Sequence, residues 1–249
     1  MSLQSFFQAN RSLAIRLTRY LPQATTHPFL LYEEMVVRYM HQFPQPVILD
    51  VGGGTECCFS KHKPPGGRII SVDISSAQLA QNRDADLLML ADVTRDIPLP
   101  DGSVDLVVSR AVMEHLTSPR AFLHHAYRVL KPGGYCIHVF PCRFALFATI
   151  NRGLPQHLPR KFLSTFQPDI HEKGGFPAYY RQCYPSAMKR LLQQGGFQIR
   201  EMVPYYFQSV YFDFFLPFFL VSALYELATR GWVDLAAFLL IAAKKPADV

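Results

Sequence analysis

The stretch VILDVGGGTE, residues 47–56, decides the fold of this chain. Its first five residues are apolar apart from Asp50, and such a run is typical of a strand covered by helices on both faces. The glycines that follow, Gly52 to Gly54, let the backbone turn tightly and come close to a ligand. Because a purely structural turn gives the same pattern, a binding site here needs support from other segments.

Apolar runs of strand length continue along the chain and alternate with helical segments. This alternation predicts a single α/β domain with a doubly wound, mostly parallel sheet and helices on both faces. The runs expected as strands are 47–51, 68–73, 86–92, 104–109, 134–140, 197–206 and 235–245. The segments expected as helices are 3–20, 30–42, 119–131 and 185–194.

Two further acids stand at the ends of predicted strands. Asp73 ends the second strand about 20 residues beyond the glycine turn, where a dinucleotide-type site needs an acid for the ribose hydroxyls. The alternative is that Asp73 caps a helix that starts at Ser75 or Ser76. Asp92 ends the third strand, and a nicotinamide-binding fold does not require an acid there. The spacing between the glycine turn and Asp73 favours a site for a nucleoside cofactor.

Two longer motifs, IPLPDGSVDLVVSRAVMEHL at 97–116 and RVLKPGGYCIHVFP at 128–141, contain the fourth and fifth strands with their turns. With the three acids, they make the chain resemble class I S-adenosylmethionine-dependent methyltransferases, in particular the branch of the ubiquinone and menaquinone C-methyltransferases. The resemblance covers residues 46–141. It implies a Rossmann-like sheet with an antiparallel closing strand, and S-adenosylmethionine as the cofactor.

The resemblance also implies a role for each matched residue. Asp50, Gly52 and Gly54 would surround the methionine part of the cofactor, and Asp73 would bind the ribose. Asp92 and Val93 would bind the adenine, and Ser109 and Arg110 would lie on the sulfonium side. The chain departs from the family at Glu56, where a third glycine is common. A glutamate suits a positive helix end but competes with the cofactor's carboxylate. Pro64 and Pro65 make the helix after the glycine turn short.

A methyl transfer needs alignment more than catalytic groups, so the sequence offers few candidates for catalysis. His115 is the best candidate for a base, because it lies where the family's acceptor pocket opens and imidazole titrates in the useful range. The alternative is that His115 only hydrogen-bonds a loop backbone. Glu114 and His171 are weaker candidates. The cluster PAYYRQCY, 177–184, suggests acceptor contacts from Tyr179, Tyr180 and Arg181, or ordinary surface packing.

Charge and apolar residues are unevenly distributed. The formal charge is +6, and residues 143–200 hold nine Lys or Arg against two Asp or Glu. The longest uncharged run of the apolar segment 205–232 is 214–225, about 12 residues, which is too short to span a bilayer. We expect this segment, with the amphipathic helix 3–20, to touch a membrane surface, to line an apolar pocket or to pack on the core.

The five cysteines form no CxxC spacing, and no secretory signal precedes them, so we expect reduced thiols, a cytoplasmic protein and no metal site. The expected division is a helical cap at 1–45, a cofactor-binding core at 46–141, a substrate insertion or lid at 142–184, and a closing helix and strands at 185–249. No feature of the sequence predicts the oligomeric state.

The sequence therefore predicts an enzyme that methylates a small, apolar or lipid-like acceptor, with peripheral membrane contact as an option. The alternative from another class is a noncatalytic protein of this fold that engages a membrane surface or a partner. A nicotinamide oxidoreductase is disfavoured by Asp92 and by Cys57, which replaces the last glycine of GxGxxG. Nucleic acid is disfavoured as the acceptor, because the fourth strand runs into SRAVMEHL without a Pro-aromatic motif.

Overall fold

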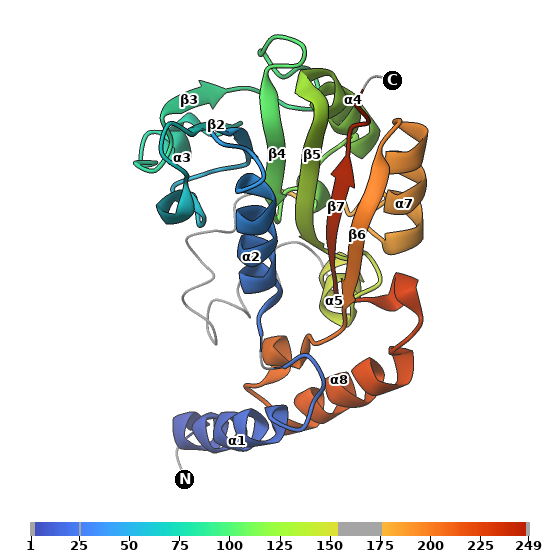
Figure 1. Ribbon diagram of the computed structural model, residues 1–249. Helices are drawn as coiled ribbons and strands as arrows, with labels where there is room; N and C mark the ends of the chain where they lie inside the picture. The colour runs from blue at the N-terminus through green and yellow to red at the C-terminus, as the bar shows by residue number, and fades with distance from the viewer. Residues whose placement is uncertain (1–2, 25, 154–175, 248–249) are drawn as a thin grey trace.

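The structure, a computed structural model, describes residues 3–24, 26–153 and 176–247, so His171 lies outside the described residues. Its centre is a seven-stranded sheet with the order β3-β2-β1-β4-β5-β7-β6 (Figure 1). The strands are β1 (Val47–Val51), β2 (Arg68–Asp73), β3 (Leu87–Leu90), β4 (Val104–Arg110), β5 (Leu130–Pro141), β6 (Gln198–Tyr205) and β7 (Phe238–Lys244).

The sheet confirms the predicted fold class. Strands β1 to β5 pair in parallel, and β7 runs antiparallel between β5 and β6. Strand β1 lies between β2 and β4, so the chain moves outward in opposite directions from β1 and from β4. Open α/β sheets bind ligands at such a reversal, outside the carboxyl ends of the strands.

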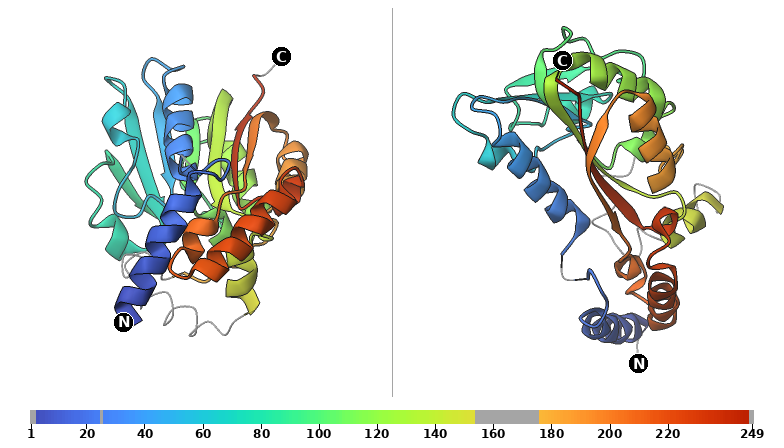
Figure 2. Two further views of the ribbon diagram at one scale, coloured as in Figure 1. Left: turned by 90° about the horizontal axis from the view of Figure 1, so that it is seen from below. Right: turned by 45° about the vertical axis from the view of Figure 1, so that its right-hand side comes forward.

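Helices cover both faces of the sheet. Helix α2 (Pro28–Met40) contacts β4, β5 and β7 on one face, while α4 (Pro119–Val129) and α7 (Pro185–Gln194) pack together on the other (Figure 2). Each of these three helices has proline in its first turn, where the missing N–H is not needed. The shorter α3 (Ser76–Leu79) follows β2, and α5 (Leu146–Gly153) follows β5.

The glycine turn after β1 does not lead into an α-helix, which corrects the expectation of a short one. Residues 52–67 contain only a 3-10 turn, η1 (Ser60–His62). The Asn82 side-chain amide instead donates to the carbonyl oxygens of Gly53 and Gly54 at 3.2 Å each. The Asp84 carboxylate accepts from the Cys57 N–H at 2.8 Å. The loop after β2 therefore satisfies backbone groups of this turn.

Helices α1 (Leu3–Thr18) and α8 (Leu216–Thr229) lie together at one end of the molecule, beyond the sheet (Figure 1). They share a small apolar cluster, separate from the main core, of Ala14, Phe219 and Ala223. The apolar segment 205–232 also contains the 3-10 turn η4 (Ser209–Phe212), and η5 (Val233–Leu235) follows it. No helix in the described ranges is long and apolar enough to cross a membrane.

Candidate functional site

A cavity of about 580 Å³ lies at the carboxyl ends of β1, β2 and β4, beside the segment that follows β3. This volume is in the range of small-molecule sites, and the position is the crevice expected for an open α/β sheet. The cavity brings together most of the residues singled out from the sequence. Those that line it are Asp50, Gly52, Gly54, Asp73, Asp92, Val93, Arg110, His115 and Tyr179.

Three of the predicted site residues do not line this cavity. Ser109 is fully buried, and its hydroxyl lies 2.7 Å from His138 Nδ1 inside the sheet. Successive strand residues point to opposite faces, so β4 cannot direct both Ser109 and Arg110 to the same site. Tyr180 is buried outside the cavity, and Arg181 donates to the Thr117 carbonyl at 2.9 Å beside a separate hollow. The structure therefore does not bring Ser109, Tyr180 and Arg181 to this cavity with the other predicted residues.

The glycine turn needs its glycines. Gly52 has a φ of +67°, in the left-handed region that other residues rarely adopt, and its N–H donates to Val72 O at 2.7 Å. An added Cβ at Gly53 would collide with Ser71 Oγ and lie 2.9 Å from Asp50 Oδ2. The backbone of the glycine turn therefore packs directly against β1 and β2, which leaves no room for a side chain at Gly53.

Asp73 and Asp92 present carboxylate oxygens to the cavity from two strand ends. Asp73 Oδ2 accepts from Gly54 N at 3.2 Å, and Oδ1 accepts from Ser75 N at 2.8 Å. Ser75 itself caps α3, with its Oγ accepting from Gln78 N, so Asp73 is not the cap. Asp92 Oδ1 accepts from the N–H and hydroxyl of Thr94 at 2.9 and 2.6 Å. These bonds orient both acids, which can still accept from a ligand.

Asp50, Tyr32 and Arg110 form the buried end of the site. Burial raises the pKa of Asp50 to about 7, while the Arg110 guanidinium opposes the shift. The Tyr32 hydroxyl is fully buried and has no hydrogen-bond partner in the described part of the chain. A buried polar group without a partner is costly.

Glu56 lies at the cavity beside Arg110 and is partly neutralised by it. Its Oε1 atom is 3.4 Å from Arg110 Nη2. The Arg110 guanidinium also lies 5.7 Å from the centre of the Phe29 ring. The glutamate that departs from the family pattern therefore belongs to an ion pair that an incoming carboxylate would share.

His115 is held by the segment that precedes α7. Its Nδ1 atom lies 3.0 Å from the Pro177 carbonyl oxygen, which can only accept, so Nδ1 carries the proton in this contact. Burial lowers the pKa of His115, and the bond to Pro177 opposes the shift. The imidazole is therefore largely neutral at pH 7, with Nε2 unprotonated. His115 bonds a loop backbone and also lines the cavity, with Nε2 3.7 Å from Glu114 Oε1, and its role as a base stays a prediction.

Glu114 precedes His115, and its main chain contacts the segment at Tyr179 that lines the cavity. Its carbonyl oxygen accepts from the N–H groups of Tyr179 and Tyr180 at 2.7 and 2.9 Å. Its side chain is buried, and Oε2 has no hydrogen-bond partner among the described residues. Burial raises the pKa of Glu114 to about 8, so the carboxyl is mostly protonated at pH 7.

The wall of the cavity that α2 and the segment before α7 provide was not predicted from the sequence. Phe29 and Tyr32 come from α2, and Phe176 and Pro177 come from the end of the long insertion. Phe29 and Tyr32 are three residues apart and share one helix face, but that spacing is the same for residues packed in a core. No local signal distinguishes the two environments.

Comparison with known proteins agrees with this geometry. Residues 49–138 match a methyltransferase domain family. The chain is 36% identical over 111 residues to malonyl-[acyl-carrier protein] O-methyltransferase of Yersinia pestis, covering 43% of this chain and 38% of that protein. It is 32% identical over 114 residues to a ubiquinone/menaquinone biosynthesis C-methyltransferase of Cupriavidus metallidurans, covering 42% and 46%.

The fold is also similar to solved structures. An S-adenosylmethionine-dependent methyltransferase from Mesorhizobium loti superposes with a TM-score of 0.53 at 20% identity, covering 86% of this chain and 97% of that chain. The present chain spans less than half the length of the two curated relatives above. The comparisons confirm the resemblance inferred from the sequence, and S-adenosylmethionine is the cofactor of this family.

Proposed function

We propose that this chain, whose core is a class I S-adenosylmethionine-dependent methyltransferase domain, transfers a methyl group to a small, apolar or lipid-like acceptor. The observation that carries the proposal is one cavity lined by the glycine turn and by acids from three successive strand ends, Asp50, Asp73 and Asp92. Peripheral contact with a membrane is a separate proposal that does not depend on methyl transfer.

The lining fits the cofactor at each end. Asp73 is suited to accept hydrogen bonds from ribose hydroxyls, and Asp92 with Val93 is suited to hold the adenine. Gly52 and Gly54 let the methionine part approach the backbone, while Asp50 and the Tyr32 hydroxyl provide polar partners there. The Arg110–Glu56 pair borders this end of the cavity. In this proposal, 46–141 binds the cofactor.

The acceptor side of the cavity is mainly apolar and aromatic. Phe29, Leu116, Phe176 and Tyr179 line it, together with His115. The two curated relatives are named as an O-methyltransferase for malonyl-[acyl-carrier protein] and as a C-methyltransferase of ubiquinone/menaquinone biosynthesis, which supports a lipid-like acceptor. The walls come from the expected helical cap and from the end of the insertion 142–184, of which residues 154–175 lie outside the described residues.

His115 is the residue we propose to accept a proton when the acceptor must lose one. The bound cofactor supplies a methyl group already activated on a sulfonium, so the protein mainly aligns the acceptor and excludes water. With Nδ1 donating to Pro177, the neutral imidazole keeps Nε2 free of a proton. No other described imidazole lines the cavity.

The proposal is tested by binding and by turnover. We expect the purified protein to bind S-adenosylhomocysteine in a calorimeter and to transfer labelled methyl to quinols, phenols or fatty acyl acids. His115→Asn should lower kcat by about 100-fold, the usual range for a general base, with little change in cofactor affinity. His124→Asn, a histidine on α4, is the matched control. Binding without transfer to any acceptor would favour the noncatalytic alternative, and no cofactor binding would refute the proposal.

Cofactor affinity should depend on pH through Asp50. Its pKa lies near 7 in the free protein, and the cofactor's ammonium group would favour the ionised form. Below pH 7, binding must release a proton, so affinity should rise with pH and level off above about 7. Calorimetry in buffers of different ionisation enthalpy measures that proton. Asp50→Asn should remove the dependence, Asp101→Asn should keep it, and a flat profile in the unmodified protein would contradict this role.

A further inference from the structure

Helix α8 presents apolar residues to solvent and polar residues to the protein. The buried residues of this helix are Phe219, Ser222, Ala223, Glu226 and Thr229. From 217 to 228, every exposed residue is apolar. The largest of them are 44% to 67% exposed and are Phe218, Leu220, Val221, Leu224 and Leu227. A surface helix of a globular protein normally has the opposite arrangement.

Specific hydrogen bonds fix α8 in this orientation. Glu226 Oε1 accepts from Gln208 N at 2.7 Å, and from the N–H and the hydroxyl of Ser209 at 2.6 Å each. The Tyr225 hydroxyl donates to the Phe144 carbonyl at 3.0 Å. Rotating the helix to bury its apolar face would expose these polar groups and break all four bonds. These four hydrogen bonds therefore hold the apolar face of α8 toward solvent.

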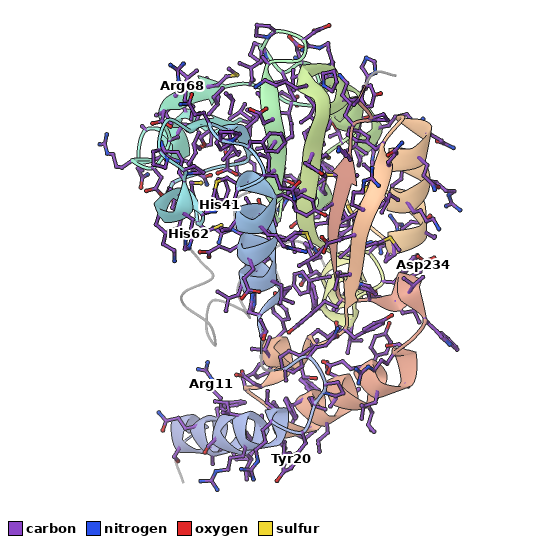
Figure 3. All side chains as sticks on the ribbon, viewed as in Figure 1. Arg11, Tyr20, His41, His62, Arg68 and Asp234 are labelled. Atoms are coloured by element: carbon purple, nitrogen blue, oxygen red, sulfur yellow. The ribbon has the colours of Figure 1, made fainter. Side chains whose placement is uncertain are left out.

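Helix α1 extends the same surface. Its Ala14 packs against Phe219 and Ala223 of α8, and the two helices lie side by side across one end of the molecule (Figure 2). Leu13 and Leu17, one turn apart on α1, are exposed apolar residues as well, and so is Tyr20 just beyond the helix. Tyr20 lies at the end of the molecule opposite Arg68 (Figure 3). We call these exposed residues of the two helices the α1–α8 face.

The charges around the α1–α8 face are positive. Arg16, Arg19 and Arg230 are exposed beside it. Segments 3–24 and 209–233 contain two acids, Asp213 and Glu226, and both are buried. An apolar surface bordered by exposed arginines, without an exposed carboxylate in these two segments, is complementary to an anionic and apolar partner.

We propose that the α1–α8 face binds the surface of an anionic lipid bilayer, with the apolar side chains of α8 among the acyl chains and the arginines at the headgroups. A second copy of the chain fits less well, because a two-fold contact would bring the same arginines together. Binding of this kind needs no spanning helix.

The position of the face suits an acceptor dissolved in lipid. In Figure 1 the β7 arrow points away from α1 and α8. Strands β1 to β5 run opposite to β7, so their carboxyl ends, where the cavity lies, point toward the α1–α8 end. The surface and the cavity therefore share one end of the molecule. The proposal does not depend on methyl transfer, since lipid binding is measured without the cofactor.

Vesicle flotation tests the proposal. We expect the protein to float with vesicles of phosphatidylcholine containing about a quarter phosphatidylglycerol, and less with pure phosphatidylcholine or at high salt. Val221→Asp/Leu224→Asp should reduce the bound fraction at least about tenfold, because two side chains no longer enter the apolar region. Arg16→Glu/Arg19→Glu should abolish the preference for anionic vesicles. The matched control is Leu87→Asp/Leu88→Asp, which changes two exposed residues of β3 far from this face.

Circular dichroism and thermal unfolding confirm that each variant folds. Equal flotation of the α8 variant and the β3 control, in folded proteins, would overturn the proposal. So would absence of flotation in the unmodified protein. If sedimentation shows a dimer that Val221→Asp/Leu224→Asp dissociates, the face is a contact between two copies, and the proposal is also overturned. Cofactor binding that survives either result leaves the methyltransferase proposal intact.

Discussion

Asp73→Ala is expected to weaken binding of S-adenosylhomocysteine by about 1 to 3 kcal/mol, roughly five- to 150-fold in Kd, because a buried ribose hydroxyl would lose its acceptor. Asp92→Ala should have an effect of the same order through the adenine amino group. Titration calorimetry measures both values. The matched control is Asp101→Ala, an exposed acid that pairs with Arg128 away from the cavity, and its affinity should not change.

Asp73 also accepts from Gly54 N and Ser75 N, so its alanine variant could lose affinity through a loosened turn. Melting temperatures separate the two causes. Asp73→Asn has one accepting oxygen for two N–H donors, so it keeps only one of these bonds, and we expect it to recover part of the melting temperature and part of the affinity. A loss of affinity in Asp73→Ala without a lower melting temperature would assign the effect to the ribose contact. If Asp73→Ala and Asp92→Ala both bind as tightly as the unmodified protein, the site assignment is wrong.

Glu114→Gln is expected to stabilise the protein at alkaline pH. Burial raises the pKa of Glu114 from 4.5 to about 8. Between these values the folded protein keeps a proton that the unfolded chain has lost, so the free energy of unfolding falls as pH rises. The loss is complete above about pH 8 and is on the order of a few kcal/mol. The substituted amide would remain neutral at every pH and would not contribute to this loss.

Urea unfolding at about pH 5 and about pH 8.5 measures the difference. The two proteins should have similar stability at the lower pH, and the variant should be more stable at the higher pH. Glu34→Gln, which changes an exposed glutamate on α2, is the matched control and should follow the unmodified protein. Parallel curves for the unmodified protein and Glu114→Gln would show that the buried carboxyl is ionised at neutral pH.

The parts of the fold that depend on local pattern could be predicted from the sequence. The apolar run before Gly52 and the spacing to Asp73 and Asp92 predicted three strand ends, because strands of a parallel sheet leave their carboxyl ends at one edge. The fold class, the seven strands and the helices α1, α2, α4 and α7 followed from the same pattern. The cavity that these ends share is the site expected from that topology.

The parts that failed depend on the direction of single side chains or on distant partners. Ser109 and Arg110 are neighbours in one strand, and only the register of β4 decides which of them faces the cavity. Tyr180 has a φ of +51° and is buried, and no local motif in the sequence predicts this backbone conformation. The orientation of α8 depends on Glu226 meeting a backbone segment 17 residues earlier. A short stretch of sequence does not show strand register or distant hydrogen-bond partners.

The acceptor wall is attached through main-chain atoms. The Tyr179 and Tyr180 N–H groups donate to the Glu114 carbonyl, and the Pro177 carbonyl accepts from His115. None of these contacts uses the side chains of Phe176 or Tyr179, which face the cavity. These main-chain contacts would remain if the two rings were exchanged for other shapes, while the ring contacts of Phe176 with His115 and of Tyr179 with Arg181 would change. Under the proposed function, the acceptor preference can change at this wall while the cofactor half of the cavity stays unchanged.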